Sequence, residues 1–118
     1  MEVKTLLCRH SVVKALKCKV ETLTAGETLF VEGLQGSAAA AYIGAVRELS
    51  AQGRLFVVVL NDEDEAAYFF GDLQALYGET DVMFFPSPYK RGVKYASIDP
   101  ANEILRTDVL SRLATIGS

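Results

Sequence analysis

The residues whose types and spacing come closest to a functional motif form a glycine turn between two apolar stretches. Residues 28–31, Thr-Leu-Phe-Val, are rich in β-branched and aromatic side chains, which predicts a strand, and the GLQGS run at 33–37 predicts a tight turn. Residues 38–46 have the composition of a helix that packs closely on a sheet. In such a layout, backbone N–H groups and the positive end of the helix dipole can surround an anion such as phosphate.

This turn has the outline of a phosphate-binding P-loop without its functional side chains. Measured against G-x-x-x-x-G-K-[ST], Ala38 replaces the second glycine, Ala39 the lysine and Ala40 the hydroxyl residue. The lysine ordinarily contacts the β- and γ-phosphates and the hydroxyl holds magnesium, so we predict no catalytic residue and no metal here. A plain glycine turn before an alanine-rich helix is the alternative. The vestigial loop comprises Gly33, Leu34, Gln35, Gly36, Ser37, Ala38, Ala39 and Ala40.

Two weaker contact sites accompany the loop. Because helix N-termini attract anions, a weakly held sulfate or phosphate is expected at Gly36, Ser37 and Ala38. In the segment 87–95, three bases lie among tyrosines, a pattern that can hold single-stranded nucleic acid by charge and stacking. The net charge of −3 favours an ordinary surface loop instead. The three bases are Lys90, Arg91 and Lys94.

Length and composition fit a single soluble domain with a proper core. The chain has 118 residues, half of them apolar, and it shows neither a membrane-span pattern nor a signal peptide, so we expect a cytoplasmic protein. Cys8 and Cys18 have neither disulfide nor metal-pair spacing and are expected to be buried thiols. His10 has no neighbouring ligand pattern.

Hydrophobic periodicity predicts an N-terminal helix followed by three strand–helix units. Continuous apolar runs such as RLFVVVL at 54–60 are typical of parallel strands buried on both faces. We therefore expect an α/β fold, a small three-layer (α/β/α) parallel sheet of the P-loop NTPase or helicase type with about three strands. The N-terminal helix and connector are expected at 1–27 and a partial α/β domain at 28–118. Helices are expected at 2–18, 38–53, 62–77 and 99–113, and strands at 28–31, 54–60 and 81–85.

The acidic run after the second strand has two possible roles. Asn61 or Asp62 can cap the following helix, whose dipole favours acids in its first turn. Alternatively, acids after a parallel strand can hold magnesium, as in receiver domains. Capping explains the run Asp62 to Glu65 without a metal. Asp99-Pro100 likewise predicts the start of the last helix.

Four pieces of the sequence together resemble the N-terminal UvrB-like region of the bacterial transcription-repair coupling factors, the Mfd family. The resemblance covers about residues 28–114, and it rests on the order and spacing of the pieces. UvrB itself has an intact P-loop and a long tyrosine-rich hairpin; the alanines at 38–40 and the short segment after Phe85 depart from both. The pieces are GLQGSAAAA, FVVVLNDEDEAAYFFGDL, FFPSPYKRG and DPANEILRTDVLSRL.

The resemblance implies a non-catalytic module of a larger ATP-dependent DNA translocase. Such a protein engages double-stranded DNA, displaces stalled RNA polymerase and recruits UvrA for nucleotide excision repair. ATP and magnesium would serve only its motor, so no cofactor is expected for this chain. The main UvrA-contacting surface of the family lies in a domain inserted after this region, and no membrane is involved.

Two alternatives remain from the sequence. A UvrB-related ATPase or helicase fragment could still bind nucleotide, with a lysine or arginine of the segment 90–94 replacing the loop lysine. A receiver-like or flavin-binding domain would use Asp62 and Asp64, although such a domain normally has five strands.

Overall fold

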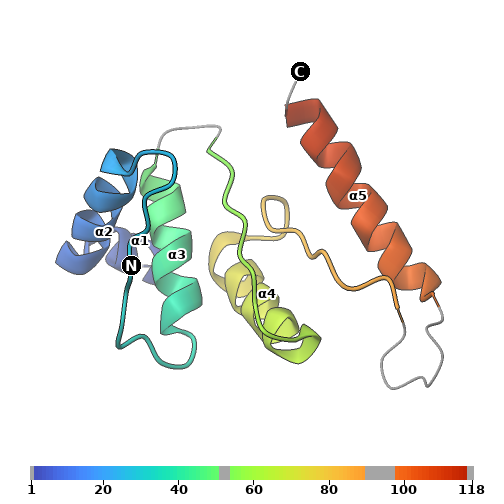
Figure 1. Ribbon diagram of the computed structural model, residues 1–118. Helices are drawn as coiled ribbons and strands as arrows, with labels where there is room; N and C mark the ends of the chain where they lie inside the picture. The colour runs from blue at the N-terminus through green and yellow to red at the C-terminus, as the bar shows by residue number, and fades with distance from the viewer. Residues whose placement is uncertain (1, 51–53, 90–97, 117–118) are drawn as a thin grey trace.

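The computed structural model describes residues 2–50, 54–89 and 98–116, and these form five helices (Figure 1). Within those ranges there is no strand; an isolated antiparallel bridge joins Tyr89 to Ile98. None of the described helices is long and apolar enough to cross a membrane. The helices are α1 (Val3–Arg9), α2 (Ser11–Thr22), α3 (Ala38–Leu49), α4 (Glu63–Tyr77) and α5 (Pro100–Ile116).

The expected α/β fold with its parallel sheet is therefore wrong. The three predicted strands, 28–31, 54–60 and 81–85, are irregular segments, and their backbone groups make no hydrogen bond to any described residue. Apolar composition makes a strand only where a second segment supplies the hydrogen-bonding ladder. The three segments have the apolar composition that favours strands, but they do not pair with one another.

Helix α3 packs on other helices, whereas the sequence predicted that it would pack on a sheet. Its small residues Ala40, Gly44 and Ala45 are buried, and it packs against α1, α2 and α4. Small side chains let helix backbones approach one another as closely as they approach a sheet, so the same composition serves both architectures. The core cluster consists of Val13, Ala45 and Val46, bordered by Leu7, Cys8, Leu16, Val20, Tyr42, Leu49 and Phe56.

The N-terminal region is two helices rather than the single helix predicted over 2–18. The chain breaks at His10, whose backbone is extended (φ −66°, ψ 134°). The His10 side chain stabilises the break, because its Nδ1 accepts a hydrogen bond from the backbone N–H of Val12 at 3.2 Å. Cys8 and Cys18 consequently lie on separate helices; both are free, and Cys18 is exposed rather than buried.

The predicted start of α4, its end at Gly78 and the predicted start of α5 are confirmed, whereas α3 ends at Leu49 with Ser50 extended, before the expected end at 53, and α5 continues to Ile116, past the expected end at 113. Asp62 caps α4 by accepting the N–H of Glu65 at 2.8 Å, and Gly78 ends that helix with φ +91°. Asp99 caps α5 by accepting the N–H of Ala101 at 3.0 Å, with Pro100 as the first helical residue. These ends follow from local chemistry that needs no tertiary partner.

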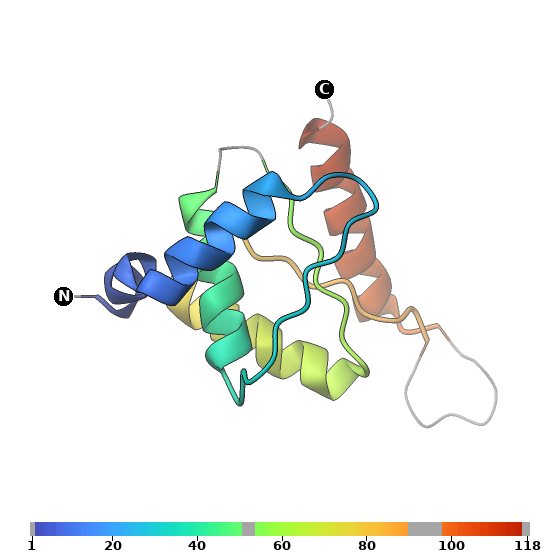
Figure 2. The same ribbon diagram turned by 60° about the vertical axis from the view of Figure 1, so that its left-hand side comes forward.

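Helix α5 stands clear of the other four helices and is attached to the segment before it (Figures 1 and 2). The Arg106 guanidinium donates to the carbonyl oxygen of Pro86 at 2.9 Å and lies 4.1 Å from the centre of the Phe85 ring. Asn102 donates to the carbonyl oxygen of Ser87 at 3.0 Å. The attachment thus depends on polar contacts to backbone rather than on a helix–helix interface.

The chain exposes far more surface than a compact protein of its size. Its accessible area is 8614 Å², whereas a folded monomer of this mass exposes about 6,300 Å². The radius of gyration is 16.0 Å, compared with about 13.5 Å for a compact domain of this length. The described residues therefore leave much apolar surface in solvent, including Phe30, Val57 and Val59.

Candidate functional site

The vestigial loop adopts the predicted bend into a helix. Gly33 and Gly36 have φ values of +86° and +57°, which side-chain-bearing residues rarely adopt. The backbone N–H of Ala38 donates to the carbonyl oxygen of Gln35 at 3.1 Å, and α3 begins at Ala38. The turn and the helix are thus confirmed, while the strand expected before them is absent from the described residues.

The alanines of the loop serve packing. Ala40 is buried, while Ala38 and Ala39 are half-buried at the start of α3. Their methyl groups offer neither charge nor a hydroxyl, as the sequence already indicated. A larger side chain at 40 would disturb the contact between α3 and its neighbours.

The expected anion site at this loop has fewer free donors than predicted. Of Gly36, Ser37 and Ala38, the third already uses its N–H in the turn to Gln35. Ser37 is exposed, and its hydroxyl makes no capping hydrogen bond. The remaining prediction is a weak contact of an anion with the N–H groups of Gly36 and Ser37. The predicted basic contact loop, Lys90, Arg91 and Lys94, lies outside the described residues.

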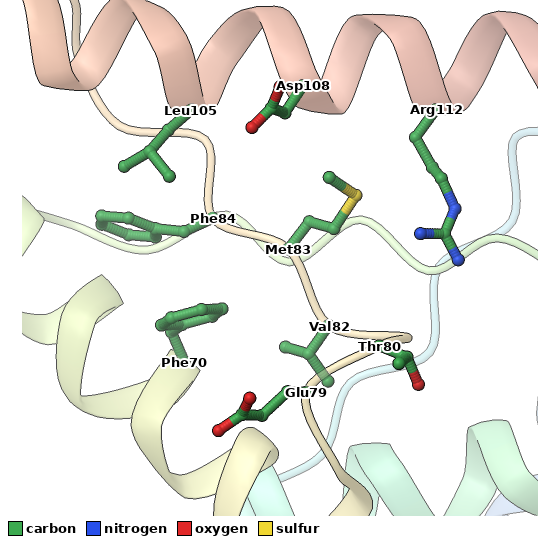
Figure 3. A pocket seen from close by; sticks show the side chains of 9 residues that line it. All are labelled: Phe70, Glu79, Thr80, Val82, Met83, Phe84, Leu105, Asp108 and Arg112. Carbon is green, nitrogen blue, oxygen red and sulfur yellow. The ribbon is translucent and has the colours of Figure 1, made fainter.

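A shallow apolar pocket, which the sequence did not indicate, lies between Phe70 in the middle of α4, the segment 79–84 and α5 (Figure 3). Its volume is about 290 Å³. Phe70 and Phe84 stack in its wall with ring centres 5.4 Å apart, and Asp108 and Arg112 border it from α5. The lining contains no histidine or cysteine, so the pocket is better suited to binding an apolar side chain than to catalysis. It is lined by Phe70, Glu79, Thr80, Val82, Met83, Phe84, Leu105, Asp108 and Arg112.

Two of the acids at the start of α4, Asp62 and Glu65, are engaged in capping. Besides the Asp62 cap, the Glu65 carboxylate accepts the Asn61 backbone N–H at 3.2 Å and its side-chain amide at 3.0 Å. No group of three or more potential metal ligands occurs among the residues that the structure describes. The capping role predicted for Asp62 is confirmed, and the magnesium alternative gains no support.

Tyr77 joins α4 to α3 and has the largest pKa shift among the described groups. Its hydroxyl donates to the carbonyl oxygen of Ala41 at 2.6 Å. Burial, with smaller contributions from Cys8 and Glu48, raises the pKa of Tyr77 to about 12. Burial first and then the Glu48 carboxylate also raise the pKa of the Cys8 thiol, which disfavours the nucleophilic thiolate.

Tyr77 should make the folded chain sensitive to alkaline pH. An unfolded tyrosine loses its proton near pH 10, whereas folded Tyr77 keeps it to about pH 12. Because the folded state then binds more protons, the free energy of unfolding should fall as pH rises through this window. Urea denaturation of the natural chain and Tyr77→Phe should show this extra alkaline loss only in the natural chain. At neutral pH, Tyr77→Phe should cost about 1 kcal/mol for the lost hydrogen bond. Identical pH profiles for the two chains would contradict this.

Comparison with known proteins identified no related protein. None of the protein-family models, characterised proteins or solved structures that were compared with this sequence matches it.

Proposed function

We propose that this chain is a non-catalytic interaction module, the opening part of the UvrB-like region of a transcription-repair coupling factor. The observation that supports this proposal is the bend at Gly33 to Ala40, which leads into α3. At the positions where a P-loop has its lysine and its hydroxyl residue, this chain has alanines. The downstream sequence pieces that resemble that family support the same assignment.

The large exposed apolar surface supports an interaction role rather than a catalytic one. The apolar pocket has no paired nucleophile and base among its lining residues. Exposed apolar side chains on three separate segments instead offer contact area for other protein parts.

Within this proposal, the intact protein is a cytoplasmic, ATP-dependent DNA translocase. It engages RNA polymerase and double-stranded DNA, and it recruits UvrA mainly through surfaces outside this chain. Reading the coding sequence downstream of Ser118 tests the assignment: an intact helicase motor and a polymerase-binding domain are expected, and their absence would overturn it.

The non-catalytic role is tested by calorimetric titration of the chain with ATP and magnesium. The natural chain should bind nucleotide no more tightly than about 1 mM. The matched variant Ala39→Lys restores the loop cation, a contact worth about 1.5–3 kcal/mol, so its affinity should rise roughly tenfold to a hundredfold. Micromolar, magnesium-dependent binding by the natural chain would refute the proposal and favour an ATPase or helicase fragment.

A further inference from the structure

We draw no further inference here: the strongest candidate, the shallow apolar pocket between Phe70 of α4, the segment 79–84 and α5, is bordered by side chains of both charges, and nothing in the structure shows what covers it.

Discussion

Replacing Gly44 with leucine should cost the folded chain about 3 kcal/mol, because the position has no room for a side chain. A Cβ built on Gly44 would lie 2.6 Å from both Cδ2 and Cζ of Tyr77, well inside van der Waals contact. The ring of Tyr77 cannot simply swing away, since its hydroxyl is bonded to Ala41. The substitution should therefore separate α3 from α4, which urea denaturation followed by circular dichroism would detect.

Gly71 provides the matched control for this substitution. It lies within α4 and has no atom within 4 Å of its built Cβ, so leucine there should meet nothing. Leucine favours helices over glycine, and Gly71→Leu should therefore be neutral or stabilise the chain by about 0.5 kcal/mol. Equal stabilities of Gly44→Leu and Gly71→Leu would show that the α3–α4 contact is not as described.

Truncating Val13 to alanine should cost about 2 kcal/mol, the second large effect expected. Val13 is fully buried and is the largest side chain in the described part of the chain with no exposure. It contacts the core cluster from α2, so the lost methyl groups leave a void between α2 and α3. Equilibrium unfolding in urea measures the difference directly.

The neighbouring Val12 tests whether burial causes this loss. It lies on the same helix but is 47% exposed, and Val12→Ala removes the same two methyl groups. Because alanine also favours helices, Val12→Ala should change the free energy of unfolding by less than about 0.5 kcal/mol. Losses of similar size at the two positions would place the core elsewhere.

Local signals in the sequence predicted both ends of α4 and the start of α5. Asp62, Gly78 and the pair Asp99-Pro100 act through bonds within their own turn, so their effect does not depend on distant residues. The break at His10 was missed because the apolar periodicity continues across it. The interruption is marked by the extended backbone of His10 and by the hydrogen bond from Val12 to the histidine ring.

The sheet could not be decided from composition. A run such as 54–60 indicates that a strand is favourable, but a strand exists only when another segment binds its edge. In the described residues, α3 packs on helices through Gly44 and Ala45, and the apolar runs stay unpaired. Composition alone does not distinguish a helix covered by a sheet from one covered by other helices.

The candidate site was predictable only in part. The bend at Gly33 and Gly36 follows from two glycines, whose backbone freedom is a property of single residues. The pocket could not be predicted, because Phe70, Phe84 and Leu105 meet only after α4, an irregular segment and α5 are placed in space. The use of the Ala38 N–H within the turn likewise appears only in the geometry.

The separate position of α5 has a consequence for how the chain unfolds. Because α5 shares no interface with another helix and is held through carbonyl groups of the segment 86–88, it can open while the remaining helices stay packed. Amide protons of α5 should therefore exchange with solvent faster than those around Val13. A single melting temperature would describe α1 to α4, and it would overstate the cooperativity of the whole molecule.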